Sequence, residues 1–535
     1  MDMSTRASMI ARLREPAPFD LLVAGGGITG CGVAYEAAAR GARVLLLEQR
    51  DFASGTSSRS TKLIHGGIRY LKHADFRLVS EGVRERQNLI DQAPHLVHPV
   101  RFVYPVHQGD PDPLWALRLG LILYDWFAGK RNVLPHRIMG GQSLLEEEPL
   151  LRPEGIRGGA MYADCLTDDA RLTMEVAKAA AREGAVLLNY MEVRRFLYDD
   201  AGRVAGVEAA DRLAGDTPIQ LRARAVLNAT GPWLDRIREM EEPGCPPVLR
   251  PTKGAHITVR HQRLPIRHPV VMHGPDRRMM FAVPRDGFTY LGTTDTDYKG
   301  DLEDVRPDRS DVAYILAAAG HTFPSVRLSE ADVVSAWAGI RPLAATTETA
   351  GPSQVSREYK LHTSPSGLVS VAGGKLTAFQ SMARAIVRQM LPHLPHYEVP
   401  LKLSCAVPAP TAAEARRIGR DLGLGAAEIL ELWSRHGAET LDVLGHVRPA
   451  PAPERVRMLA AEAAFAAARE FAVTLTDILH RRTAQMLFSD DNGLGAARAA
   501  AEAAGEILGW DETESEQQVD AYQAEVDAMM AWRRT

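Results

Sequence analysis

The chain has 535 residues, of which 45% are hydrophobic and 24% charged, and its formal net charge is −4. This composition is that of a globular protein with a large core, and it gives no electrostatic reason to expect nucleic-acid binding. The four cysteines, Cys31, Cys165, Cys245 and Cys405, lie far apart and form no metal-ligand spacing. We therefore expect free thiols in a reducing compartment and no bound metal.

The sequence begins with residues 1–17, which carry arginines but no long apolar core. We interpret them as a tail or a short preceding helix rather than a signal peptide. No segment of the chain reaches the length that a membrane-spanning helix needs.

A glycine-rich turn comes first among the predicted functional elements. An apolar strand leads into Gly25-Gly26-Gly27-Ile28-Thr29-Gly30, and a small-residue helix and a second apolar strand follow, ending at Glu48. Such a turn aims backbone N–H groups and a helix N-terminus at one point, which suits a pyrophosphate. Gly25 permits the tight turn, Gly27 lets phosphates approach the backbone, and Gly30 lets the helix pack on the strand. Glu48 is placed to bind an adenosine ribose, so the pattern predicts a dinucleotide site.

The polar loop of residues 49–67 follows Glu48 and is expected to run along the cofactor. The hydroxyl groups of Ser57, Ser58, Ser60 and Thr61 are candidate contacts to that cofactor. Arg69 and Tyr70 come directly after the loop, where a pocket beside the cofactor would draw its side chains.

The most apolar segment is residues 114–127, which are interrupted by Arg118 and Asp125. One interpretation is a buried helix. The other is a helix lying in a membrane interface, with its aromatic residues at the apolar boundary and basic residues among the headgroups. The residues alone do not decide between the two.

The second half of the chain repeats the alternation of strands and glycine turns. The strands of residues 158–227 end in a small-residue turn that contains Gly231, and the strands of residues 255–292 predict an antiparallel sheet. A later strand enters a second glycine turn, Gly373-Gly374-Lys375. Beyond the proline-rich residues 395–410, an alanine- and leucine-rich composition predicts a helical domain without a catalytic signal of its own.

Six segments carry a recognisable set of motifs in a fixed order. They are DFASGTSSRSTKLIHGGIRYL at residues 51–71, NATGPW at 228–233, KGAHI at 253–257, GTTD at 292–295, GIRPL at 339–343 and GGKLT at 373–377. With these segments the chain strongly resembles the FAD-dependent glycerol-3-phosphate dehydrogenase family. The resemblance extends more weakly through residues 470–483 and so covers nearly the whole chain.

The resemblance implies that FAD is the cofactor, with the Ser57-Ser58 loop and the Gly373-Gly374 turn flanking its ribityl chain and ring. It implies oxidation of the C2 hydroxyl of glycerol 3-phosphate to dihydroxyacetone phosphate, with a hydride passing from C2 to the flavin N5. Electrons then pass to membrane quinone, at the cytoplasmic face of the inner membrane. This gives the 114–127 helix a role, so the interfacial interpretation becomes the favoured one.

The substrate is a dianion, and a pocket specific for it needs fixed cations. Arg69 and Arg341 each come shortly after a glycine in a motif segment, and arginine binds phosphate bidentately. We assign the phosphate to these two arginines, and Tyr70 is a candidate for a further hydrogen bond to it. Thr293 and Thr294 are candidate contacts to the substrate hydroxyls.

Removing a hydride from an alcohol requires a base near the hydroxyl group. His256, on a predicted strand, is our choice, and His65 is the rival. Lys375 follows a glycine turn and is assigned to polarise the substrate oxygen or to stabilise reduced flavin. We therefore name His256, Arg341 and Lys375 as the catalytic residues.

The predicted fold class is α/β: a two-lobed FAD-binding Rossmann-like fold with an antiparallel-sheet substrate domain and an all-helical C-terminal domain. The expected division is an N-terminal tail (1–17), three parts of the FAD-binding domain (18–107, 156–242 and 335–394), a substrate or membrane-contact segment (108–155), a substrate domain (243–334), a linker (395–410) and the helical domain (411–535).

Other functions remain open at this stage. An amino-acid or amine oxidase on the same scaffold needs one carboxylate-binding arginine, and the pair Arg69 and Arg341 argues against it. A flavin-binding adaptor that docks on membranes needs no base such as His256. Sequence does not decide between quinone and oxygen as the acceptor, nor whether the chain forms a homodimer. Residues 490–493 lack the spacing of the calcium-binding loop found in the mitochondrial branch, so no calcium control is expected.

Overall fold

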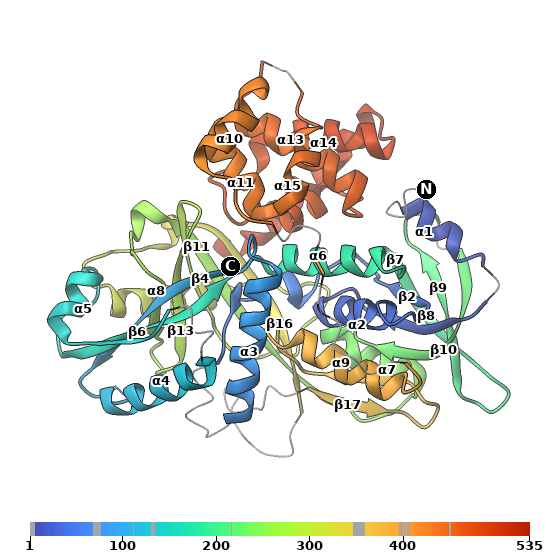
Figure 1. Ribbon diagram of the computed structural model, residues 1–535, viewed down its shortest axis with the longest axis horizontal. Helices are drawn as coiled ribbons and strands as arrows, with labels where there is room; N and C mark the ends of the chain where they lie inside the picture. The colour runs from blue at the N-terminus through green and yellow to red at the C-terminus, as the bar shows by residue number, and fades with distance from the viewer. Residues whose placement is uncertain are drawn as a thin grey trace.

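The computed structural model describes residues 6–15, 17–67, 76–110, 112–129, 134–215, 217–345, 359–394, 400, 402–403, 407–448 and 451–534. Figure 1 shows two sheet-based parts side by side, with the C-terminal helices (orange to red) lying over α6. The fold class predicted from the sequence is confirmed.

The first sheet carries the glycine turn. In the described residues it has eight strands: β1 (Phe19–Ala24), β2 (Val44–Leu47), β7 (Val186–Leu188), β8 (Met191–Tyr198), β9 (Val204–Asp211), β10 (Pro218–Asn228), β17 (Lys360–Thr363) and β18 (Val369–Ala372). Its centre is parallel in the order β18-β10-β1-β2-β7, and β8 and β9 extend β10 as an antiparallel meander. The carboxyl ends of β1, β2, β10 and β18 therefore meet at one edge, where a doubly wound sheet binds its ligands.

The second sheet is mixed but mainly antiparallel. In the described residues it has ten strands: β3 (Leu63–Ile64), β4 (His98–His107), β5 (Arg137–Met139), β6 (Ile156–Leu166), β11 (Leu249–Arg260), β12 (Val270–His273), β13 (Met279–Arg285), β14 (Phe288–Gly292), β15 (Thr296–Asp297) and β16 (Val333–Ala344). Strand β11 pairs with both β14 and β16, so residues from three separated motifs lie next to one another.

Helices cover both sheets and form the C-terminal part. Those before residue 395 are α1 (Arg6–Arg12), α2 (Ile28–Ala38), α3 (Phe76–Gln92), α4 (Leu114–Ala128), α5 (Gly141–Glu147), α6 (Asp169–Arg182), α7 (Leu234–Glu241), α8 (Arg309–Thr322) and α9 (Phe379–Met390). The C-terminal ones are α10 (Ala412–Gly419), α11 (Ala426–His436), α12 (Thr440–Leu444), α13 (Glu454–Arg469), α14 (Leu494–Leu508) and α15 (Glu512–Met529), with a π-helical turn at Asp477–Arg482. Helix α2 packs against α6 and α9, and this layer buries the parallel sheet.

The expected domain boundaries do not coincide with the sheets. Strands β4 and β6 belong to the second sheet, although residues 18–107 and 156–242 were assigned to the FAD-binding domain. Local patterns predict a strand but not the sheet that it joins, because pairing is decided by contacts distant in sequence.

Candidate active site

The glycine turn has the geometry that the sequence predicts. Gly25 has a φ of +113°, and a Cβ atom there would lie 2.5 Å from the carbonyl oxygen of Ala229. A Cβ atom on Gly30 would lie 1.9 Å from the carbonyl oxygen of Gly25. Only glycine fits these two positions, so the N-terminus of α2 stays open toward a ligand.

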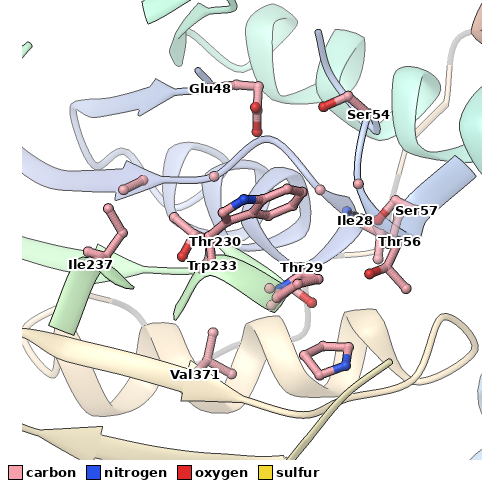
Figure 2. A pocket seen from close by; sticks show the side chains of 18 of the residues that line it. Ile28, Thr29, Glu48, Ser54, Thr56, Ser57, Thr230, Trp233, Ile237 and Val371 are labelled. Atoms are coloured by element: carbon pink, nitrogen blue, oxygen red, sulfur yellow. Dashed lines mark hydrogen bonds between the residues drawn. The ribbon is translucent and has the colours of Figure 1, made fainter. Parts of the chain in front are cut away.

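The carboxylate of Glu48 stands at the end of β2, beside this turn (Figure 2). It accepts hydrogen bonds from the backbone N–H of Gly26 at 2.7 Å and from that of Arg50 at 2.9 Å. Burial raises the pKa of Glu48, and these two backbone donors counteract the rise. The two amides fix the direction of the carboxylate at the position where a ribose is expected.

The loop after Glu48 lines the same cavity, but not with every hydroxyl predicted. Ser57 Oγ accepts a hydrogen bond from the N–H of Ile28 at 3.0 Å, at the first turn of α2. Ser58 is buried, its hydroxyl points to the carbonyl of Gly55 at 3.5 Å, and it does not line the cavity. Ser60, a further candidate from the sequence, lines the cavity, and so does Thr56, which we did not single out.

Two cavities of about 230 and about 240 Å³ join at the glycine turn after β18. The first contains, besides the glycine turn and Glu48, the predicted cofactor residues Gly231, Gly373 and Gly374. Both are lined by Thr56, Ser60, Pro342, Gly374, Lys375 and Leu376. The two cavities are therefore neighbours along this turn, and we call the second one the chamber.

The chamber brings together four of the residues predicted from separate motifs. His256, Thr293, Arg341 and Lys375 all line it, because β11, β14 and β16 are adjacent and the β18 turn faces them. Thr294 does not: it is buried, donates a hydrogen bond to Asp311 at 2.9 Å and accepts one from the N–H of Ala255. Its side chain therefore supports the strand, and its role as a substrate contact stays a prediction from the sequence.

Arg341 is half-buried and oriented by its neighbours. Its Nη1 lies 2.9 Å from Oδ1 of Asp295, and its Nη2 donates a hydrogen bond to Thr293 Oγ1 at 3.0 Å. The guanidinium also lies against the backbone of β11, so closely that a Cβ atom on Gly254 would lie 2.6 Å from Nη2 of Arg341. A guanidinium held in this way presents its charge with little loss of side-chain freedom.

His256 is 2% exposed, and its ring stacks on Trp337 with centroids 4.8 Å apart. Its Nε2 lies 3.0 Å from Thr61 Oγ1, and its buried Nδ1 has no hydrogen-bond partner among the described residues. Burial, followed by the charges of Arg341 and Lys62, lowers the pKa of His256 well below its usual value. The imidazole is therefore neutral near pH 7 and can accept a proton.

Other predicted residues have mixed outcomes. His65, the rival base, also lines the chamber, as does Gly67. Arg69 and Tyr70 lie outside the described residues. Sequence reasoning did not find Asp164, which lines the chamber from β6, because nothing in its local pattern shows that β6 joins the second sheet.

The first cavity fits a dinucleotide: glycines with no room for a side chain face the N-terminus of α2, and a fixed carboxylate stands at the second strand. In the chamber, the cationic side chains of Arg341 and Lys375 and the neutral ring of His256 lie next to that cavity. Such an arrangement is that of a dinucleotide-dependent oxidoreductase.

Comparison with known proteins places the chain more closely. Residues 20–380 match the family described as FAD dependent oxidoreductase, and residues 401–515 match the C-terminal domain of alpha-glycerophosphate oxidase. An aerobic glycerol-3-phosphate dehydrogenase of Staphylococcus epidermidis is 34% identical over 555 aligned positions, which cover 100% of this chain and 98% of the relative. The chain belongs to the FAD-dependent oxidoreductase family and, within it, to the aerobic glycerol-3-phosphate dehydrogenases.

Solved structures agree with this membership. The glycerol-3-phosphate dehydrogenase from Bacillus halodurans, complexed with FAD, superposes with a TM-score of 0.82 at 35% identity and covers 99% of this chain and 98% of its own. The L-alpha-glycerophosphate oxidase of Mycoplasma pneumoniae, with FAD bound, has a TM-score of 0.56 at 18% identity and shares the fold alone.

Proposed function

We propose that this protein oxidises sn-glycerol 3-phosphate at C2 to dihydroxyacetone phosphate, using FAD. The observation that carries the proposal is the chamber, where Arg341 and Lys375 face a neutral His256 next to the cofactor cavity. The full-length similarity to aerobic glycerol-3-phosphate dehydrogenases supports it.

Substrate binding is assigned to the cations of the chamber. The phosphate dianion pairs with Arg341, whose direction is fixed by Asp295 and Thr293. Arg69 and Tyr70 remain predicted as further residues that bind the phosphate. Gly67, which precedes them in the chain, lines the chamber. Thr293 is the predicted threonine that lines the chamber.

His256 takes the proton of the C2 hydroxyl group at a ring nitrogen. Its lowered pKa keeps the ring neutral until that proton arrives, and its stack on Trp337 fixes the ring plane. FAD, when bound, supplies the acceptor of the hydride that leaves C2. Lys375 lies where the two cavities meet, so its charge can stabilise the anionic form of the substrate oxygen or of the reduced ring.

Membrane association is proposed through α4. Four large apolar side chains of this helix are exposed, Trp115 by 71%, Leu119 by 55%, Ile122 by 46% and Trp126 by 72%. Their spacing places them on one helical face, and Leu117, Leu121 and Tyr124 are buried on the opposite face. This supports a helix lying in a membrane interface rather than a fully buried one.

In the described part of the chain, no helix has the length and apolarity to cross a bilayer. From the exposed apolar face of α4 we propose that the protein lies on the membrane surface through this helix and passes its electrons to a membrane quinone. The inner face of the cytoplasmic membrane and a homodimer remain predictions from the sequence.

The test is an anaerobic mixing experiment with the purified FAD-loaded protein. Glycerol 3-phosphate is expected to bleach the flavin absorbance rapidly, and sarcosine or glycine is expected to leave it unchanged. Bleaching by an amine would assign the chamber to the alternative amine oxidase activity. Absence of bleaching by glycerol 3-phosphate would contradict the proposed substrate.

A further inference from the structure

A buried polar cluster forms part of one wall of the chamber, which its member Asp164 lines. Its members are Tyr124 on α4, Arg86 on α3, Asp164 on β6 and the backbone of Gly66. The hydroxyl of Tyr124 donates to Asp164 Oδ1 at 2.6 Å and accepts from the N–H of Gly66 at 2.9 Å. Arg86 Nη1 lies 2.7 Å from Asp164 Oδ1 and 3.0 Å from the hydroxyl of Tyr124.

The cluster binds the backbone of residues 65–66 from one side, and Thr377, which follows the Gly373-Gly374-Lys375 turn, binds it from the other. Thr377 Oγ1 accepts from the N–H of His65 at 3.2 Å and donates to its carbonyl at 3.3 Å. The next residue, Gly66, donates its N–H to both Tyr124 and Asp164 Oδ1, the latter at 3.0 Å. Since His65 and Gly67 line the chamber, this segment forms part of its wall.

The contact with Tyr124 is too close for any other residue at position 66. A Cβ atom on Gly66 would lie 2.2 Å from the Tyr124 hydroxyl oxygen. Asp164 and Arg86 balance each other's charge, and burial raises the pKa of Tyr124, so the hydroxyl stays protonated. The hydroxyl therefore donates its hydrogen bond to Asp164, and its oxygen accepts a hydrogen bond from the amide of Gly66.

We infer that Tyr124 is a positioning residue for the substrate, which ties helix α4 to the chamber wall at Gly66. The inference rests on the proposed function for its effect on substrate binding. It adds a role for the inner face of α4, the helix whose outer face carries the exposed apolar residues. The Tyr124 hydroxyl is the direct hydrogen bond from α4 to the backbone of this wall.

Tyr124→Phe removes that hydroxyl and little else, and Tyr522→Phe is the matched control. Tyr522 is a buried tyrosine of α15 whose hydroxyl donates to the carbonyl of Asn492, away from the chamber. Tyr124→Phe should lower the unfolding temperature more, because its hydroxyl contacts Asp164, Gly66 and Arg86. Only Tyr124→Phe should raise the Kd for glycerol 3-phosphate, by about 5- to 10-fold, because the amide of Gly66 is then held by Asp164 without the tyrosine hydroxyl.

The Kd is read from the substrate dependence of anaerobic flavin reduction in the FAD-loaded proteins, and the limiting rate should stay within about twofold of wild type, because His256 and Arg341 are untouched. In parallel, hydrogen exchange of the peptide that contains residues 63–67 should be faster in Tyr124→Phe and unchanged in Tyr522→Phe.

An unchanged Kd in Tyr124→Phe, or an equal rise in both variants, would overturn the inference. So would unchanged hydrogen exchange at residues 63–67. If wild-type flavin is not reduced by glycerol 3-phosphate at all, the proposed function fails, and the exchange experiment still decides whether Tyr124 holds the wall.

Discussion

His256 depends on its surroundings for its chemistry. A solvated imidazole has a pKa near 6.5 and is partly charged at neutral pH. Here burial removes water from the ring, and Arg341 and Lys62 add positive charge nearby, so the pKa falls well below that value. The same arginine that attracts the phosphate thus keeps the base neutral, which couples the two roles at the scale of single residues.

The lowered pKa of His256 predicts how the reaction responds to pH. Because the neutral form persists as the pH falls, the limiting rate of flavin reduction should stay flat from pH 8 to about pH 6 rather than decline near 6.5. The measurement is stopped-flow reduction at saturating glycerol 3-phosphate.

His256→Gln is the control for this pH profile, and it should slow reduction by roughly 100-fold or more at every pH. A wild-type rate that halves near pH 6.5, with that step absent from His256→Gln, would show that the ring titrates like a solvated imidazole and contradict the assignment.

At the scale of elements, α4 has two faces with different tasks. Its buried face packs against α3 and β6, and its exposed face carries Trp115 and Trp126. Figure 1 shows α4 at the opposite end of the molecule from the C-terminal helices, so a flat surface can approach it without meeting them. Aromatic residues at such a position suit the boundary between headgroups and acyl chains.

Replacing both Trp115 and Trp126 with Glu should release the protein from liposomes. The variant lacks the two tryptophan side chains that we expect to insert into the lipid. Its partition coefficient between liposomes and water should therefore fall on the order of 100-fold. The measurement is liposome flotation, with the flavin spectrum as the check on folding.

Leu441→Glu is the matched control for this experiment, since Leu441 is 63% exposed on α12 in the C-terminal part. It should float with liposomes as wild type does. Persistent flotation of the double tryptophan variant would mean that another surface binds the lipid.

At the scale of the whole molecule, buried charges join the C-terminal helices to the cofactor part. Asp51, three residues after Glu48, accepts from Arg482 at 2.8 Å and from Arg481 at 2.5 Å, both on the π-helical turn. On α6, Arg171 lies 2.6 Å from Glu470. The C-terminal domain therefore holds the loop that lines the cofactor cavity, and the two parts should unfold together.

Asp51→Asn tests this connection, because it leaves two buried arginines without their shared carboxylate. Burial alone would raise the pKa of Asp51, but Arg482 and Arg481 lower it, so the group is charged at neutral pH. The free energy of unfolding should fall by about 3–5 kcal/mol. Denaturant unfolding at pH 7 measures it.

Asp490→Asn is the control for the buried pair, because Asp490 pairs with Arg260 at the surface. Its effect should stay within about 0.5 kcal/mol. Equal losses in the two variants, or a C-terminal domain that unfolds in a separate step, would contradict the coupling.

Much of this organisation was predictable from the sequence because its signals are local. The glycine turn and Glu48 depend on contiguous residues, and the structure confirms their geometry. The convergence of His256, Thr293, Arg341 and Lys375 followed from motif resemblance and not from periodicity, since they lie on different strands and turns.

The remainder depends on pairings that are distant in sequence. The membership of β6 in the second sheet brings Asp164 to the chamber and within hydrogen-bond distance of Tyr124 on α4, and no local pattern shows this. Ser58 and Thr294 show the same limit. Each follows a hydroxyl residue that lines a cavity, Ser57 or Thr293, but is itself buried, and a motif does not show which of two neighbouring hydroxyls faces the cavity.

The central claim is that Arg341 binds the phosphate group of glycerol 3-phosphate, the proposed substrate that reduces the flavin. The most direct measurement compares the second-order rate constants of anaerobic flavin reduction by glycerol 3-phosphate and by glycerol, in wild type and in Arg341→Ala. Arg341→Ala should lower the constant for glycerol 3-phosphate by roughly 100-fold and leave that for glycerol nearly unchanged, because only one of the two carries the dianion. Equal losses for both substrates, or none for either, would contradict the account.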